Sequence, residues 1–163
     1  MTSVQAEDQR IVFSLQGEHY ALPITAVQEI IRYTPPGATA AATGLIRGMI
    51  NLRGRVLPVV DLSPGLGGEL EVGSATRILV IEVSNGALGL IVDAVEGIER
   101  IAPERIEPLP AAANRELGDQ IAAIGDRLIV LIDPERALGA LLPARKPPAR
   151  RRRPSSARPR ASS

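Results

Sequence analysis

The chain has 163 residues and is 45% hydrophobic, yet it contains only two Tyr, one Phe and no Trp, so a core of Val, Ile, Leu and Ala is expected and sites that stack bases or sugars on aromatic rings are disfavoured. The absence of Cys excludes disulfides and thiolate chemistry. No apolar run approaches the ~18 residues needed to cross a bilayer, so we expect a cytoplasmic protein without membrane insertion.

Short apolar runs rich in Val and Ile, bounded by Gly, Pro or Asn, indicate strands rather than helices. In chain order, strands are expected at 10–15, 19–22, 55–60, 77–83, 87–92, 120–124 and 127–132. SLQGEHY and EVSNGALGL look like hairpin turns, and the Asn-Gly pair of the second is typical of turns whose two central residues have positive φ. One short helix is expected after Asp133, which can cap it, because Pro134 suits the first helical position and ERALGALL follows.

A self-comparison of the sequence indicates an internal duplication. Three pairs of segments match in the same order: RIVFSL (10–15) with RILVIE (77–82), YALPITAVQEI (20–30) with LGLIVDAVEGI (88–98), and RVLPVVD (55–61) with RLIVLID (127–133). Each half supplies about five strands, enough for a small closed barrel without exposed edges. We therefore expect an all-β domain over 10–143 that consists of two packed and intertwined barrels, about 10–75 and 76–143, with a crevice between them.

The segment GMINLRGRVLPVVDL (48–62) places Arg53 and Arg55 around a glycine, ahead of an apolar run. Its Gly and Asn residues indicate a loop or a bulged strand, in which extended backbone would point both arginine side chains to one face. Pro58 indicates that the following strand lies at a sheet edge or a bulge, where no ladder donor is missed.

Two interpretations of these arginines remain open. Both can be solvated surface residues, or one guanidinium can lie across the crevice between the barrels and pair with a carboxylate. Glu29, within AVQEI, is the best candidate for that carboxylate. Its counterpart in the second half is Gly97, so the fold does not require an acid at this position.

With Gly-x-x-Asn-x-Arg-Gly, an apolar strand containing Pro and a final Val-Asp-Leu, this segment resembles the signature of CheW-like domains. VQEIIRY, ALGLIVDAVEGI and IAAIGDRLIVLIDPERAL resemble the corresponding blocks, so the resemblance spans about 10–142. It implies two packed five-stranded SH3-like barrels that act as a non-enzymatic adaptor between chemoreceptors, the methyl-accepting proteins, and a CheA-type histidine kinase. The implied partners are the kinase regulatory domain, the cytoplasmic tip of the receptor and other CheW-like domains, in membrane-associated or cytosolic receptor arrays.

Position by position, the resemblance also implies a receptor-facing groove that accepts the apolar stripe of a receptor helix. Its residues in this chain are Val27, Glu29, Gly48, Asn51, Arg53, Ile78, Gly89 and Ile98. Aliphatic walls would receive the helix, and glycines would let its backbone approach. Arg53, oriented by Glu29, would set direction and register more than affinity.

No catalytic or metal motif is found in the sequence, and we expect no enzymatic activity, no cofactor and no metal. His19, the only histidine, lies beside a predicted turn and is expected to be a solvated hairpin residue. Asp61, Asp93 and Asp133 end strands and are expected to cap backbone donors. SPGLGGE lacks the Lys-Ser/Thr of a P-loop.

Flanking the predicted domain are an N-terminal extension, 1–9, and a basic tail, 144–163. The tail holds eight of the 19 basic residues and no acidic residue, so all 18 acidic residues lie in 1–143. Rich in Arg, Pro and Ser, it is expected to be disordered. Its cluster Arg150, Arg151, Arg152 and Arg153 would attract nucleic acid or another polyanion. A small β-barrel protein tethered to a polyanion by this tail is therefore the alternative function; contact with acidic protein surfaces and a tail without function also stay open.

Overall fold

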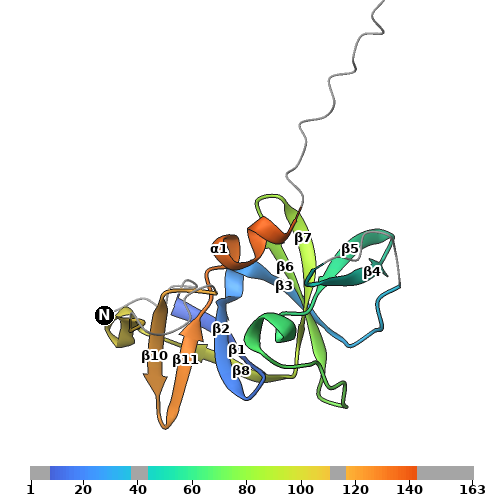
Figure 1. Cartoon of the computed structure of the whole chain (residues 1–163). Coiled ribbons are helices and arrows are strands. Elements are labelled where there is room, and N and C mark those ends of the chain that lie inside the picture. The colour runs from blue at the N-terminus through green and yellow to red at the C-terminus, as the bar shows by residue number, and fades with distance from the viewer. Residues whose placement is uncertain (1–7, 38–43, 111–116, 143–163) are drawn as a thin grey trace, which may run out of the picture.

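The structure, a computed structural model, describes residues 8–37, 44–110 and 117–142. Its elements form two sheets and one short α-helix joined by 3-10 turns (Figure 1). The elements are β1 Gln9–Leu15, β2 Glu18–Pro23, η2 Ile24–Ala26, β3 Val27–Arg32, β4 Ile46–Leu52, β5 Arg55–Val60, η3 Ser63–Leu66, β6 Arg77–Val83, β7 Gly86–Val92, β8 Ala94–Arg100, η4 Pro103–Arg105, β9 Ile106–Pro108, β10 Gln120–Ile124, β11 Arg127–Leu131, α1 Pro134–Leu138 and η5 Gly139–Leu141.

Every strand expected from the sequence is present, with ends that differ by at most one residue. Four further strands, β3, β4, β8 and β9, escaped the sequence pattern. β3 begins four residues and β8 two residues after the end of the preceding strand, and both alternate between half-buried and exposed positions. The exposed positions carry polar or charged side chains as well as one isoleucine in each strand. Such strands lack both the apolar run and the turn residues on which the prediction depended.

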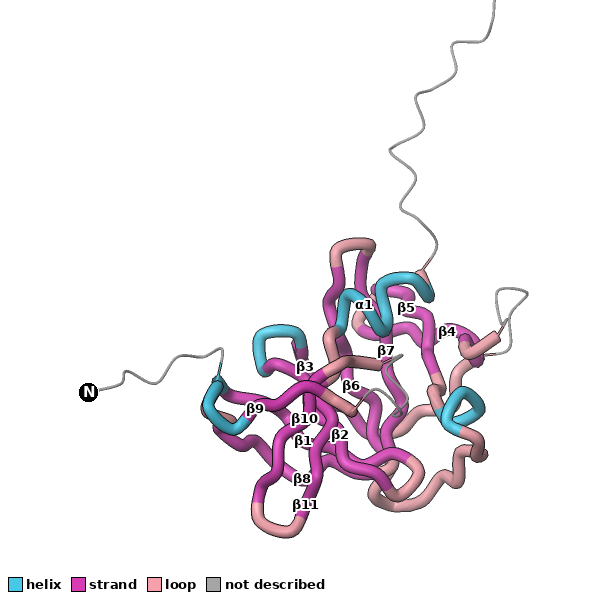
Figure 2. Tube along the Cα trace, turned by 60° about the vertical axis from the view of Figure 1, so that its left-hand side comes forward, coloured by secondary structure: helices cyan, strands magenta, loops and turns pink. Residues whose placement is uncertain are grey.

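Strand order in the two sheets mixes the two halves of the chain. One sheet has the order β8-β1-β2-β11-β10-β9 and the other β3-β6-β7-β5-β4. Each contains one parallel pair, β2 with β11 and β5 with β7. β1 and β2, the first hairpin of the first half, therefore lie in the sheet formed by strands of the second half, and β6 and β7 lie in the sheet formed by strands of the first half. Neither sheet is confined to one side of the expected boundary near residue 75. In Figure 2, β9 to β11 lie on one side of the molecule and β4 and β5 on the other.

The pairing registers repeat between the sheets and correct the sequence comparison by one residue. The pair Phe13–Tyr20 of β1 and β2 recurs as Ile81–Leu88 of β6 and β7, an offset of 68. The sequence comparison had matched the first strand, 10–15, to 77–82, which corresponds to an offset of 67 residues. Since side chains alternate between faces, a shift of one residue exchanges the two faces of the strand. Both faces are aliphatic here, so residue similarity alone did not settle the register.

Apolar side chains form three clusters that follow this alternation. Phe13, Leu22, Ile81 and Leu90 belong to the largest, a core shared by the two sheets, into which α1 and η5 also pack Leu138, with Leu142 just after them. A second cluster, including Leu57, Ile78 and Val80, fills the inside of the five-stranded sheet. The third, including Val12, Ala122 and Ile129, fills the inside of the six-stranded sheet. This is the packing of two small barrels around a common interface.

The edges of the five-stranded sheet meet through a backbone bridge. Gly37, which follows β3, pairs with Met49 of β4 through N–H···O bonds of 2.8 and 3.3 Å between nitrogen and oxygen. β3 and β4 are the two outermost strands of this sheet. The bridge therefore joins the segment that follows β3 to β4 and closes the sheet into a barrel at this point. The other sheet has six strands rather than the expected five, because the short β9 adds to β10.

Three local predictions have different outcomes. The helix after Asp133 is confirmed: Asp133 Oδ1 accepts from the backbone N–H groups of Glu135 and Arg136, and Pro134 is the first helical residue. The Asn85–Gly86 turn geometry was wrong, because only Gly86, at the start of β7, has positive φ. Pro58 was expected at a sheet edge or a bulge. β5 is not an edge strand, because it lies between β4 and β7. The register of β4 with β5 does shift between Ile46 and Gly48, and the ladder with β7 begins only at Val59, so Pro58 interrupts no pairing with β7. Among the described residues, no helix has the length and hydropathy of a membrane-spanning segment.

Candidate partner-binding site

The candidate site is built on the tight turn between β4 and β5. Arg53 and Gly54 form this two-residue turn, and both have positive φ, 53° and 83°. Such turns match the right-handed twist of the two strands. Asn51 Oδ1 accepts a hydrogen bond of 2.8 Å from the backbone N–H of Gly54, which holds the turn. Arg53 therefore lies at the tip of a hairpin, not in the extended segment considered from the sequence.

From this tip, Arg53 makes a bidentate ion pair with Glu29 of β3. Arg53 Nη1 lies 2.7 Å from Glu29 Oε2, and Nη2 lies 3.0 Å from Oε1. These hydrogen bonds raise the pKa of the Arg53 guanidinium. The Arg53 side chain stays 74% exposed and that of Glu29 27% exposed. The predicted partner of Arg53 is thus the observed one, but both residues belong to the five-stranded sheet, so the pair does not cross between the barrels.

The other half of the chain shows that the fold does not require this pair. By strand register, Glu29 corresponds to Gly97 and Arg53 to Gly125. A Cβ atom added to either glycine would meet nothing within 4 Å. The equivalent positions are therefore open surface without a charge, while the first half carries two complementary charges there.

Around the pair lie a polar cluster and exposed aliphatic side chains. Arg55 Nη1 lies 3.4 Å from Gln28 Oε1, and Arg55 Nη2 lies 3.7 Å from Glu82 Oε1; Gln28 also donates to Glu82. Val56, directly opposite Asn51 in the β4–β5 ladder, is 61% exposed. Sequence reasoning missed Val56 because nothing in an apolar run shows which members are buried.

Two of the predicted groove residues lie beneath the surface. Ile78 is fully buried in the core of the five-stranded barrel. A Cβ atom at Gly89, on the neighbouring strand, would lie 2.8 Å from Ile78 Cγ2, so the glycine leaves room for that side chain. Neither residue contacts solvent as a groove wall would. Both can affect a partner only through the residues that they support.

The packing of the five-stranded barrel explains why residue 48 is a glycine. Its φ is 154°, and a Cβ atom there would lie 2.1 Å from the carbonyl oxygen of Gly37. The glycine thus permits the bridge that closes the barrel. Real side chains do not approach a backbone oxygen so closely, so any other residue would displace residue 37.

Of the two remaining predicted groove residues, Val27 shares β3 with Glu29 and Ile98 lies in the other sheet. Val27 opens β3, is half-buried and packs against the core shared by the sheets. Ile98 belongs to β8 of the six-stranded sheet, opposite Ile11, and is 57% exposed. The structure therefore brings together Glu29, Asn51 and Arg53, with Gly48 on the same strand as Asn51.

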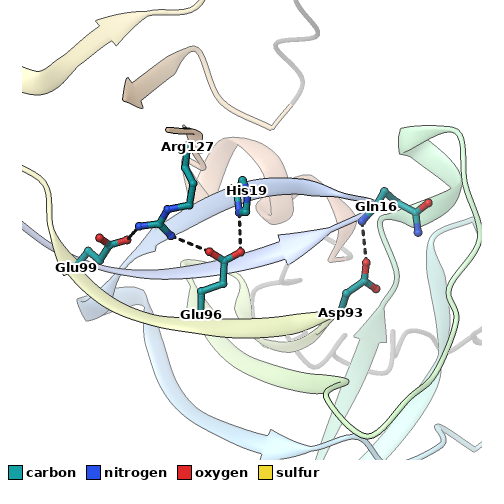
Figure 3. Close-up of polar contacts among 6 residues, drawn as sticks. All are labelled: Gln16, His19, Asp93, Glu96, Glu99 and Arg127. Atoms are coloured by element: carbon teal, nitrogen blue, oxygen red, sulfur yellow. Dashed lines mark hydrogen bonds and ion pairs between the residues drawn. The ribbon is translucent and has the colours of Figure 1, made fainter. Parts of the chain in front are cut away.

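The six-stranded sheet carries a second charged cluster, drawn in Figure 3. Arg127 lies at the start of β11, and its Nη1 and Nη2 are 2.8 Å from Glu96 Oε1 and 2.6 Å from Glu99 Oε2. Hydrogen bonds to Glu99 and Glu96 raise the pKa of Arg127. Glu96 Oε2 also lies 2.6 Å from His19 Nδ1. Over the described ranges, no cluster of His, Asp and Glu has the arrangement of a metal site.

His19 was expected to be a solvated hairpin residue. It lies in the β1–β2 hairpin, as expected, but its side chain is only 32% exposed and is held by Glu96. Its partner Glu96 is 77 residues away in the chain, so local sequence carried no signal of the contact. The capping role of the strand-ending aspartates is confirmed: Asp61 Oδ1 accepts from Ser63 N–H at 2.9 Å, and Asp93 Oδ2 from Gln16 N–H at 2.8 Å.

The candidate polyanion site of the tail, Arg150, Arg151, Arg152 and Arg153, lies outside the described residues.

Comparisons with known proteins agree on one family. Residues 9–141 match the family model described as CheW-like domain. The chain is 33% identical over 135 residues to the probable chemotaxis protein CheW of Rhizobium etli, covering 80% of this chain and 87% of that protein. It is 31% identical over 139 residues to the chemotaxis protein CheW of Bacillus subtilis, covering 83% and 89%. The crystal structure of the scaffolding protein TtCheW from Thermoanaerobacter tengcongensis matches with a TM-score of 0.72 and 33% identity, covering 78% of this chain and 89% of that chain.

Proposed function

The chain belongs to the family of CheW-like domains, and from this premise we propose that it couples chemoreceptors to a CheA-type histidine kinase through distinct surfaces. Its family and its relatives make it an adaptor of chemotaxis signalling. The proposal adds the partners: the cytoplasmic tip of a receptor, the regulatory domain of the kinase and further CheW-like domains of the same array. It places the protein in the cytoplasm, at membrane-associated or cytosolic arrays. None of the comparisons supports the polyanion-binding alternative.

The proposed receptor contact is the surface around Arg53 and Glu29. The observation that supports it most is the asymmetry between the two halves, because both members of the ion pair correspond to open-surface glycines in the second half. Exposed ion pairs contribute little to stability, so a pair that the fold does not need calls for another reason.

The geometry of the pair suits recognition of a rod-shaped partner. Two parallel hydrogen bonds to Glu29 hold the guanidinium in one orientation, while its exposed side keeps donors for a partner's oxygen atoms. Val56, on the strand after the turn, supplies exposed aliphatic surface for a helix with an apolar stripe. Charge then sets the register and the aliphatic contact supplies affinity.

The buried members of the predicted groove act indirectly in this proposal. Ile78 and Gly89 support the sheet from inside the barrel, and Gly48 closes it. Val27 lies two residues before Glu29 in β3, and Ile98 lies in β8 of the six-stranded sheet; we assign both to the flanks of the receptor contact.

The test is co-sedimentation with a cytoplasmic receptor fragment and, separately, with the kinase regulatory domain. We expect Arg53→Glu to lose receptor binding, to keep kinase binding and to remain folded, since the side chain is mostly exposed. Arg105→Glu, an equal change of charge on the exposed turn η4, serves as the matched control.

A charge-swapped double variant, Arg53→Glu with Glu29→Arg, shows whether binding depends on a direct contact of Arg53 with the receptor or only on the intact ion pair. If Arg53 contacts the receptor, the swap restores the ion pair but not receptor binding. Full receptor binding by folded Arg53→Glu would refute the proposed contact. If the wild-type protein binds neither the receptor fragment nor the kinase regulatory domain, the coupling function itself is refuted.

A further inference from the structure

A second polar site lies where β3 ends and β6 begins, away from the Arg53 turn. An open pocket of about 440 Å³ is lined there by Arg32, Tyr33, Val72, Ser74 and Arg77, among others. Arg32 is the last residue of β3, and Arg77 is the first residue of β6. No part of the proposed coupling function uses this pocket.

The two arginines are direct neighbours across the strands. Arg32 and Arg77 are paired in the antiparallel register of β3 and β6. Side chains at such positions start about 5 Å apart, and like charges there are destabilising. None of the ion pairs formed among residues 8–37, 44–110 and 117–142 involves either arginine. Two cations therefore share one pocket without a carboxylate from the described chain.

The loop before β6 holds Arg77 in place through neutral groups. Arg77 Nη1 donates to the carbonyl oxygens of Ser74, at 2.8 Å, and Thr76, at 2.9 Å. Thr76 is itself buried, and its Oγ1 accepts from Gly73 N–H at 2.8 Å, which folds the loop. Within the described residues, Nη2 and Nε of Arg77 have no hydrogen-bond partner. The guanidinium of Arg77 is thus held in one orientation, and within the described part of the chain its Nη2 and Nε hydrogens remain free to donate to a ligand.

The other half of the chain shows that a second arginine is not a requirement of the fold. By register, Arg32 corresponds to Arg100 and Arg77 to Gln9, and these two residues are also directly opposite. At that position a neutral amide faces the arginine. The same strand pair therefore forms with a single cation, and the first half carries an extra one.

We propose that Arg32 and Arg77 form an oxyanion site that binds a carboxylate or a phosphate group. Guanidinium forks match the paired oxygens of both groups, and hydrogen bonds to such charged acceptors are the strong ones. Tyr33 and Ser74 line the same pocket and carry hydroxyl donors, while Val72 gives it an apolar wall. An oxyanion bound there neutralises the repulsion between the two arginines, so binding stabilises the native state.

The test compares the full-length wild-type chain with Arg77→Gln and Arg100→Gln. Arg77→Gln reproduces the Gln–Arg pair that the other half already tolerates, and Arg100→Gln removes the same charge outside the pocket. Each protein is titrated with sodium phosphate and, separately, with a hexaglutamate peptide, at ionic strength held constant with NaCl. Backbone amide NMR shifts of residues 32–33 and 73–77 report the binding site, and the melting temperature reports stabilisation.

We expect saturable shifts at these amides in the wild type and in Arg100→Gln, with affinity at least roughly tenfold weaker in Arg77→Gln because a charge-assisted contact is lost. A response to phosphate identifies the site as one for a free phosphate group, and a response to hexaglutamate alone identifies it as a site for a partner's carboxylates. Because all three proteins keep the basic tail, binding to that tail cannot produce a difference between them. The proposal is overturned if neither probe shifts these amides, or if Arg77→Gln responds as the wild type does.

Discussion

Replacing Gly48 by Ala tests whether this glycine serves the fold or an approaching partner. In the structure, an added Cβ atom would lie 2.1 Å from the Gly37 carbonyl oxygen, so residue 37 must move and its two hydrogen bonds with Met49 are lost. Each backbone hydrogen bond contributes about 0.5–1.5 kcal/mol net, which makes the loss about 1–3 kcal/mol. Positive φ adds roughly 1–2 kcal/mol for a residue with a side chain.

Gly97 provides the matched control for this variant. Its φ of 142° is close to that of Gly48, but a Cβ atom there meets nothing within 4 Å. Gly97→Ala therefore carries the backbone strain without the collision. We expect Gly48→Ala to be less stable than Gly97→Ala by about 1–3 kcal/mol in urea unfolding, or by roughly 2–12 °C in melting temperature.

Equal stabilities of the two alanine variants would refute this reasoning, because they would show that the Gly37–Met49 bridge contributes nothing. Receptor binding then separates the two roles of the residue. A Gly48→Ala protein that is destabilised but still binds the receptor at low temperature assigns the glycine to barrel closure alone.

Two further changes test buried and exposed charges. Asp61→Asn removes the charge of a fully buried carboxylate that accepts hydrogen bonds from Arg47 Nε and Nη2 and from Ser63 N–H. We expect the free energy of unfolding, measured in urea, to fall by about 1–3 kcal/mol. A decrease below about 0.5 kcal/mol would contradict the role of this contact. Arg127→Gln breaks two ion pairs whose side chains are about one-third exposed. We expect the free energy of unfolding to fall by at most about 1 kcal/mol, and the decrease to become smaller in about 0.5 M NaCl, because salt screens exposed charges. A decrease that does not depend on salt would indicate lost packing instead of lost charge pairing.

Local chemistry explains what was predicted correctly. β-branched runs between turn residues identified the strands of both opening hairpins, and Asp133 with Pro134 identified the only described α-helix. The pairing of Arg53 with Glu29 was one of the two interpretations that the sequence left open, and its partners were identified correctly although the pair does not cross between the barrels.

Short-range patterns and the self-comparison identified seven of the eleven described strands, the duplication and the cap of the short helix, because these features depend on neighbours within a few positions or on similarity between the two halves. The three-dimensional fold was needed to show which strands share a barrel, that Ile78 is buried, that His19 contacts Glu96 and that Arg32 is paired with Arg77. Strand partners depend on how the sheets close and how their common core is filled. Residues far apart in the chain meet there, and no local preference specifies which ones.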